Sequence, residues 1–263
     1  MDLKMHSNTM ELPDGLLSRL REASSVLILT GAGMSAESGV PTFRDAQTGL
    51  WAKYRPQDLA TPEAFSRDPQ TVWDWYEERR KKIRGVSPHA GHAALVELEQ
   101  HFNSLVVVTQ NVDSLHQQAG SKDVVELHGN IMHSICSITG KRIDDDWIRE
   151  QSEHPPSSPH HTHGLARPGV VWFGESLPAD AMNRAVTLAS QCEVCFSIGT
   201  STMVQPAASL PFLALNAGAT VIEINPTPTS LSAEAHYSLQ STAATALTAI
   251  AAHLSGKPPG SVT

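Results

Sequence analysis

The sequence predicts an α/β fold built on a doubly wound, mostly parallel, Rossmann-like sheet, with a small inserted domain and a helical insertion. Short apolar runs, typical of strands buried in a parallel sheet, alternate along the chain with segments of helical apolar spacing. Glycine-rich or polar turns follow these runs. The 263 residues, of which 40% are hydrophobic, are also enough to bury a full core.

The first helix and strand are expected close to the N-terminus. Leu16, Leu17 and Leu20 recur at helical spacing and predict a helix over 14–24. The apolar run that follows predicts a short strand over 26–29, buried on both faces of the sheet.

The same order of helix and then strand is expected three more times. Ser87 and Pro88 form a typical helix start, because serine caps the helix and proline fits its first turn. That helix is expected to run to about residue 101, before a strand over 105–108. The later elements are helices near 178–190 and 206–217, strands over 194–198 and 220–224, and an alanine-rich helix near 241–254.

These elements divide the chain into a main domain, two insertions and two tails. A proline-rich and histidine-rich stretch around 154–163 is the part that most resembles a linker. We expect the Rossmann-like domain over 12–45, 87–130 and 168–255, the helical insertion over 46–86, the small domain over 131–167, and flexible tails over 1–11 and 256–263.

The composition argues against several classes of protein. The net charge of −8, from 19 Lys and Arg against 27 Asp and Glu, provides no positive field for nucleic acid or an anionic membrane. No apolar run approaches the roughly 18 to 20 residues that span a bilayer. Three cysteines do not make a disulfide framework, and the polar start lacks the apolar core of a secretory signal. We therefore expect a soluble, cytoplasmic protein, whose oligomeric state is left open.

Four polar or glycine-rich turns directly follow predicted strands, at 30–33, 109–113, 199–201 and 225–226. Because the carboxyl ends of parallel strands meet at one edge of a sheet, these turns are expected to converge on a single crevice. Glycines in the first turn let backbone N–H groups approach a phosphate. That turn lacks the third glycine of the common dinucleotide fingerprint, so an ordinary tight turn explains it equally well by itself.

The longer segment 31–44, with the sequence GAGMSAESGVPTFR, resembles the NAD-binding signature of sirtuins, which are NAD-dependent protein-lysine deacylases. Four further segments resemble motifs of this family and occur in the family's order: 109–116 (TQNVDSLH), 126–129 (ELHG), 167–175 (RPGVVWFGE) and 199–207 (GTSTMVQPA). The resemblance implies transfer of the acyl group from lysine to the ADP-ribose of NAD, with release of nicotinamide.

The resemblance also implies the roles of individual residues. His128 is the general base, and an imidazole with an ordinary pKa of about 6.5 is mostly neutral near pH 7. Asn111 and Asp113, which hold the nicotinamide amide, complete the catalytic set. The implied cofactor-binding residues, besides Asn111 and Asp113, are Gly31, Ala32, Gly33, Ser35, Thr42, Phe43, Arg44, Gln110, Val112, Gly199, Thr200, Ser201, Asn225 and Ala243; Val171, Gly174 and Glu175 are expected to pair with the substrate backbone.

A Tyr-x-x-Arg pattern predicts the acyl preference. Tyr76 and Arg79 are three residues apart on a predicted helix and therefore share one face, where a phenol and a guanidinium can hold one carboxylate. The pattern resembles class III sirtuins, which remove succinyl, malonyl and glutaryl groups, and Ala60 matches the small residue that widens their pocket. Weaker deacetylation is expected beside this activity. In an arbitrary helix, a solvated arginine beside a core tyrosine is the commoner arrangement.

The sequence departs from the family in its metal module. Sirtuins usually carry two Cys-x-x-Cys pairs that bind zinc, whereas here the first pair falls on Cys136 and Thr139 and the second on His160 and His163. We expect the zinc to be lost, with Cys136, His160 and His163 as the candidate ligands if a site persists. Packing of Ile131, Ile135, Ile138, Ile143 and Trp147 is then expected to hold the small domain together, and Cys192 and Cys195 are interpreted as core residues.

Other functions of the same pocket stay open. The chain could be mainly a deacetylase, transfer ADP-ribose to protein, or act as a catalytically silent sensor of NAD or ADP-ribose. Asn111, Asp113 and His128 argue against a silent site. A nicotinamide dehydrogenase would need an acidic residue at the end of the second strand to bind ribose, and the sequence shows no clear sign of one.

Overall fold

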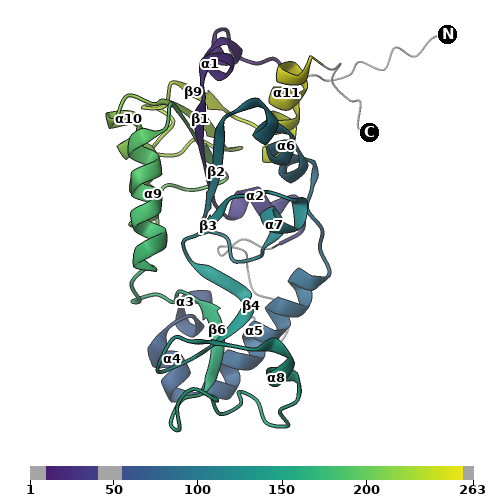
Figure 1. Cartoon of the computed structure of the whole chain (residues 1–263), viewed down its shortest axis with the longest axis vertical. Coiled ribbons are helices and arrows are strands. Elements are labelled where there is room, and N and C mark those ends of the chain that lie inside the picture. The colour runs from purple at the N-terminus through teal and green to yellow at the C-terminus, as the bar shows by residue number, and fades with distance from the viewer. Residues whose placement is uncertain (1–9, 41–54, 257–263) are drawn as a thin grey trace, which may run out of the picture.

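The computed structural model describes residues 10–40 and 55–256. Figure 1 shows a sheet with helices on both sides, joined at one end to a smaller unit. Thr42, Phe43 and Arg44, which were predicted to contact the cofactor, lie outside the described residues.

The main sheet has six strands among the described residues, in the order β3-β2-β1-β7-β8-β9, and every neighbouring pair is parallel. Strands β2 and β3, which follow β1 in sequence, lie on one side of it, and the later strands β7, β8 and β9 lie on the other. The strand order therefore reverses between β1 and β7. Ligands bind at such a reversal in doubly wound sheets. The strands are β1 Ser25–Thr30, β2 Ser104–Thr109, β3 Val124–Glu126, β7 Val194–Ile198, β8 Thr220–Ile224 and β9 Tyr237–Leu239.

Helices cover both faces of this sheet, which confirms the doubly wound prediction (Figure 1). Alternate strand residues point to opposite faces, so Ile28 packs in one cluster and Leu29 in the other. Within the described ranges, no helix has the length and apolar character needed to cross a membrane. One cluster includes side chains of α1 Leu16–Glu22, α2 Ala32–Ala36, α6 Ala90–Leu98 and α11 Ala243–Ser255; the other includes those of α9 Ala179–Gln191 and α10 Leu210–Asn216.

Several elements differ from the sequence prediction, among them α6, which begins at Ala90 with His89 as its N-cap rather than at Ser87 and Pro88. Strands β3 and β9 were not predicted, because runs of three residues are too short to show a period. The helix predicted over 206–217 is divided into a 3-10 turn, η3 Ala207–Ser209, and α10. Pro211 lies in the first turn of α10, where its missing N–H is tolerated, so it marks a helix start.

The smaller unit contains an antiparallel sheet in the order β5-β4-β6, lying beside the helical insertion (Figure 1). The sheet extends from residue 129 to residue 170. The small domain predicted over 131–167 is therefore too narrow at both ends, and residues 168–170 belong to this sheet rather than to the Rossmann-like part. The elements are β4 Gly129–Cys136, β5 Arg142–Ile143, β6 Ala166–Val170, α3 Pro56–Leu59, α4 Pro62–Arg67, α5 Pro69–Arg84 and α8 Asp145–Arg149.

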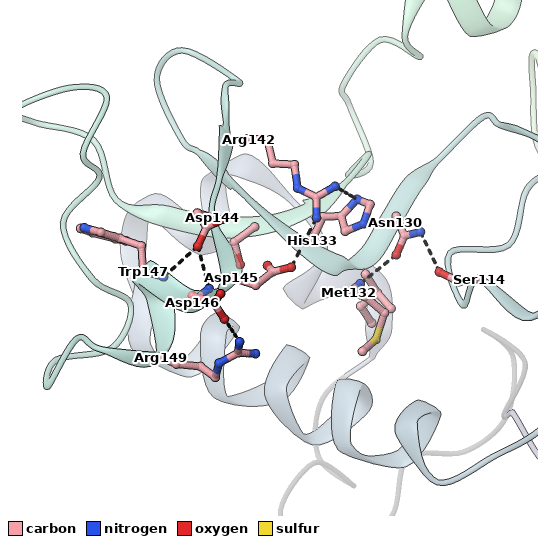
Figure 2. Close-up of polar contacts among 12 residues, drawn as sticks. Ser114, Asn130, Met132, His133, Arg142, Asp144, Asp145, Asp146, Trp147 and Arg149 are labelled. Atoms are coloured by element: carbon pink, nitrogen blue, oxygen red, sulfur yellow. Dashed lines mark hydrogen bonds and ion pairs between the residues drawn. The ribbon is translucent and has the colours of Figure 1, made fainter. Parts of the chain in front are cut away.

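Apolar packing in the smaller unit follows the prediction in part, and Ile135 is only half-buried. Ile131 and Ile143 are fully buried, and Trp147 packs against the cluster that contains Ile143. Ile138 is 58% exposed, so its predicted role in the core is wrong. It lies in the turn between β4 and β5, where the chain reverses at the surface. Helix α8 begins where the Asp144 carboxylate accepts backbone N–H bonds (Figure 2).

The N-terminal stretch is in part attached to the main domain. Met10 and Leu12 are half-buried against the cluster that contains α1 and α11. The prediction that residues up to 11 are a flexible tail is therefore wrong at Met10, which packs on the core. Helix α11 ends at Gly256, which has φ 66°, a left-handed conformation that glycine adopts readily.

Candidate active site

The first, third and fourth polar turns are joined by backbone hydrogen bonds. The N–H of Gly31 donates to the carbonyl of Ile198 at 3.0 Å, and the N–H of Gly33 donates to the carbonyl of Gly199 at 2.8 Å. The N–H of Gly199 in turn donates to the carbonyl of Ile224 at 2.9 Å. The predicted convergence of these turns at one edge of the sheet is thus realised in atomic contacts.

The second turn is joined to the others through its amide side chains. Asn111 Nδ2 donates to the carbonyl of Gly31 at 3.0 Å and to Ser35 Oγ at 2.9 Å. Gln110 Nε2 donates to Thr200 Oγ1 at 3.1 Å. The structure therefore brings these predicted cofactor residues together around one crevice.

Glycine is required where the first and third turns meet. A Cβ added to Gly31 would lie 2.8 Å from Thr200 Cβ, and one added to Gly33 would lie 2.7 Å from Gly199 Cα. Gly199 has φ 60°, and its Cβ would overlap the backbone nitrogen of Met34. Side chains are thus excluded from the crevice floor, which leaves backbone N–H groups able to approach a phosphate.

His128, between β3 and β4, is oriented as a base. Its Nδ1 lies 2.8 Å from the carbonyl oxygen of Gln110. A carbonyl accepts and does not donate, so Nδ1 carries the proton and Nε2 keeps its lone pair. Burial lowers the pKa of His128 and the bond to Gln110 raises it, with a net shift below its ordinary value. The imidazole is therefore neutral and able to accept a proton at neutral pH.

The loop that carries Asp113 is held by residues that sequence reasoning missed. Asp113 is buried, and its Oδ1 accepts the backbone N–H of Leu115 at 3.0 Å. Ser114 has φ 64°, which is uncommon outside glycine and is often found at functional sites. Asn130 Nδ2 donates to Ser114 Oγ at 2.7 Å (Figure 2). A serine with this φ between two motif residues leaves no periodic signal in the sequence.

Two of the predicted acyl-binding residues belong to the cluster between the helical insertion and the antiparallel sheet, and the third, Arg79, follows Tyr76 on α5. Ala60 and Tyr76 are buried in it. Burial raises the pKa of Tyr76 to about 12, so the phenol stays protonated at neutral pH. Burial lowers the pKa of Arg79 while Tyr76 beside it raises it, and Arg79 Cζ lies 5.0 Å from the Trp75 ring centroid. The N–H of Phe173 donates to the carbonyl of Ala60 at 2.9 Å, which ties this pocket to the segment after β6.

Trp172 and Arg167 form contacts that were not foreseen, although both lie in the motif at 167–175. Trp172 Nε1 donates to the Tyr76 hydroxyl at 3.0 Å, and Arg167 Cζ lies 3.5 Å from the Trp172 ring centroid. Glu175 accepts from Arg167 at 2.6 and 2.8 Å and from the backbone N–H of Trp172 at 2.8 Å. Both Glu175 oxygens are therefore engaged within the chain, so its side chain serves the fold of the segment predicted to bind the substrate backbone.

The other predicted residues lie around the same crevice or the strand edge. Val171 donates its N–H to the carbonyl of His128 at 2.9 Å, and Val112 accepts the N–H of Ile131 at 2.9 Å. Ala243 is buried in the first turn of α11. The remaining ones are Ala32, which begins α2; Ser201, which follows Thr200; Gly174, with φ 87° and open space around it; and Asn225, whose N–H donates to the carbonyl of Leu239 at 3.2 Å.

Three histidines that sequence reasoning did not assign lie behind the crevice. The rings of His89 and His92 are 4.3 Å apart and those of His92 and His116 are 5.0 Å apart between centroids. His116 Nε2 lies 3.0 Å from Thr30 Oγ1 at the end of β1. Burial is the main cause that lowers the pKa of His92 to about 3 and that of His116 to about 4. The rings of His92 and His116 are therefore neutral at neutral pH, and His116 supports the end of β1.

Cys136, His160 and His163, the candidate ligands if a zinc site persists, are not grouped as one site among the described residues. His160 Nε2 lies 2.8 Å from the carbonyl of Arg142, so this ring bonds the backbone. The side chains of Ser158 and Thr139 instead hydrogen-bond to Cys136; burial raises the pKa of the thiol, and these bonds, together with backbone bonds at Thr139 and Ile138, lower it to about 7. Within residues 10–40 and 55–256, no three His, Cys, Asp or Glu side chains are grouped to hold a metal ion. The loss of the zinc therefore stays a prediction, and so does the role of His160 and His163 as ligands if a site persists.

Comparisons with known proteins agree with this geometry. The model of the Sir2 family matches residues 31–206. The NAD-dependent protein deacylase of Aquifex aeolicus is 49% identical over 218 residues, covering 82% of this chain and 90% of the relative. That of Thermus thermophilus is 48% identical over 235 residues, covering 88% and 91%. A Sir2 homologue in complex with NAD has 40% identity and a TM-score of 0.87, covering 95% of this chain and 97% of the other. A complex of Sir2, a p53 peptide and NAD+ has 30% identity and a TM-score of 0.82, covering 94% and 99%.

Proposed function

This chain belongs to the Sir2 family and is an NAD-dependent protein deacylase, and we propose that its preferred substrates are protein lysines that carry succinyl, malonyl or glutaryl groups. Acetyl-lysine is a weaker substrate. The acetyl group fits the same pocket but offers no carboxylate to Tyr76 and Arg79. The observation that carries the proposal is the placement of a protonated phenol and a guanidinium side by side on α5, with the phenol packed in the cluster that contains Ala60.

NAD fits the crevice at the strand ends, and when bound it supplies the ADP-ribose that accepts the acyl group as nicotinamide leaves. The glycine-floored turns at 31–33 and 199–201 would hold its pyrophosphate through backbone N–H groups. Asn111 and Asp113 would hold the nicotinamide amide. His128 Nε2 would take a proton from a ribose hydroxyl, because Nδ1 already donates a hydrogen bond to the carbonyl of Gln110.

The acyl pocket favours an anion for electrostatic reasons. A guanidinium forms short, charge-assisted hydrogen bonds with a carboxylate, and it does so more strongly where water is scarce. The Tyr76 hydroxyl adds a donor without charge, because its pKa of about 12 keeps it protonated. The N–H of Phe173 holds the backbone at Ala60, whose methyl side chain would take less room beside the acyl group than a larger residue.

Paired peptides test this proposal. We expect NAD-dependent release of free lysine from a succinyl-lysine peptide with a kcat/KM at least about tenfold above that of the acetyl-lysine peptide of the same sequence, or about 1.4 kcal/mol in the transition state. A preference for acetyl would overturn the acidic preference and leave the deacylase activity intact. If neither peptide reacts although NAD binds, the sensor or ADP-ribosyl transfer becomes the better explanation.

Gly199→Ala is expected to weaken NAD binding by at least about tenfold, since the added methyl group forces apart the two turns that form the cradle. Isothermal titration with NAD measures this loss. Gly140→Ala is the matched control, because Gly140 has φ 67° and no neighbour within 4 Å of its Cβ. It carries the same backbone strain without the overlap. Equal NAD affinity in both variants would show that the close approach is not needed.

We also propose that the small domain holds no structural zinc. Hydroxyl groups of Thr139 and Ser158 surround Cys136, and neutral hydroxyls are poor ligands for zinc beside thiolate and imidazole. Apolar side chains around Ile143 and Ala166 pack beside Cys136. A hydrogen-bonded thiol and this packing then hold the small domain together without a metal ion.

Chelation tests the metal proposal. We expect no change in melting temperature or deacylation on prolonged incubation with a strong zinc chelator, because removal of a structural zinc would remove folding free energy. Elemental analysis of the purified protein is the second measurement. One zinc per chain, or unfolding by the chelator, would contradict the proposal.

A further inference from the structure

We propose that Trp172 is a positioning residue for acyl selectivity, whose indole N–H directs the hydroxyl proton of Tyr76 toward the acyl carboxylate. The inference rests on the proposed function. It adds a residue outside the Tyr-x-x-Arg pattern, one that lies 96 positions away from Tyr76 in sequence.

The direction of the hydrogen bond carries the argument. An indole nitrogen only donates, so in the 3.0 Å contact the Tyr76 oxygen must be the acceptor. The phenol's own proton cannot point back at the same donor and has to turn to another partner. Tyr76 is only 4% exposed, so water does not compete freely for that proton. The phenol is thereby prepared as a donor before a substrate arrives.

Trp172 is itself held from two sides. Its ring packs against Phe65, with centroids 5.3 Å apart, and Arg167 lies over it at 3.5 Å. Arg167 is fixed by its two bonds to Glu175, which also accepts the backbone N–H of Trp172. A cation over the ring withdraws electron density, which strengthens the indole N–H as a donor. The orientation of Tyr76 is therefore set by the segment that follows β6.

Substitution of the donor alone tests the inference. Trp172→Phe keeps an aromatic ring and removes the N–H. We expect the KM for the succinyl-lysine peptide to rise about fivefold, with kcat within about twofold and acetyl-lysine kinetics unchanged, since one oriented hydrogen bond is lost only with the acidic substrate. Trp147→Phe, in the same unit but away from Tyr76, is the matched control.

A double-mutant cycle gives a readout that a purely structural role would not move. In the Tyr76→Phe background, Trp172→Phe should have no further effect on the ratio of succinyl to acetyl kcat/KM, because the hydroxyl on which it acts is gone. Additive effects would overturn the inference. Equal losses on both peptides in Trp172→Phe would likewise reduce Trp172 to a packing residue.

Two observations separate this inference from the proposed function. A wild-type protein without succinyl preference overturns both, whereas a wild-type preference that Trp172→Phe leaves unchanged overturns only the inference. If Trp172→Phe does not fold, the indole N–H resonance of Trp172 is followed by NMR in the wild type and in Tyr76→Phe. A shift to higher field on loss of the acceptor supports the hydrogen bond, and an unchanged resonance overturns it.

Discussion

His128→Ala is expected to lower kcat/KM for every acyl-lysine peptide by about 10²- to 10⁴-fold, the usual contribution of a positioned general base. NAD binding should stay within about threefold of the wild type, because the two turns that form the pyrophosphate cradle, at 31–33 and 199–201, are joined by backbone hydrogen bonds in which the imidazole takes no part. Steady-state kinetics and NAD titration on the same preparation separate the two effects.

The control for this variant is His101→Ala, an exposed histidine that contacts Ser255 on the far side of the main domain. The pH profile supplies a second check. Because burial lowers the pKa of His128, the acidic limb of kcat/KM should have its midpoint below about 6.5, with activity lost as the pH falls through it. Turnover by His128→Ala at the wild-type rate would remove this residue from the mechanism.

Arg79→Met is expected to lower kcat/KM for the succinyl-lysine peptide by about 100-fold, or roughly 2 to 3 kcal/mol, because a charge-assisted contact with the acyl carboxylate is lost. The acetyl-lysine peptide should lose less than about threefold, since methionine fills a similar volume and the acetyl group carries no charge. The ratio of the two kcat/KM values is the measurement.

Two further arginine variants sharpen this test. Arg84→Met changes an exposed arginine near the end of the same helix and should leave both substrates unaffected. Arg79→Lys keeps the charge but loses the planar fork, so an intermediate loss on succinyl-lysine is expected. Equal losses on both peptides in Arg79→Met would return Arg79 to a role in packing alone.

The main sheet was predictable because buried parallel strands are continuous apolar runs, and β1, β2, β7 and β8 are of this kind. The rule that ligands bind at the carboxyl ends of such strands then predicted the meeting of the four turns. Strand β9 was not predicted because its middle residue, Ser238, is exposed and the strand is only three residues long. The length and periodicity of an apolar run therefore decide whether a strand can be predicted from the sequence.

Contacts between distant segments could not be predicted in the same way. The bond from Trp172 to Tyr76 and the contacts among His89, His92 and His116 depend on how the smaller unit and α6 pack against their neighbours. The loop near Ser158 has no periodic pattern of apolar residues. Spacing alone therefore assigned the second pair of metal positions to His160 and His163, whereas the side chain of this loop that hydrogen-bonds to Cys136 is that of Ser158, two residues before His160. In such loops, tertiary packing decides which side chains point toward the interior.

The division of the interior into separate clusters shapes how such a protein diversifies in evolution. Ala60, Tyr76 and Trp172 pack in a cluster distinct from the two that line the faces of the main sheet. Mutations at separated sites have nearly additive effects on stability, so a change in one cluster leaves the packing of the others intact. A lineage can therefore change the acyl group that it accepts through intermediates that still fold and still bind the nucleotide.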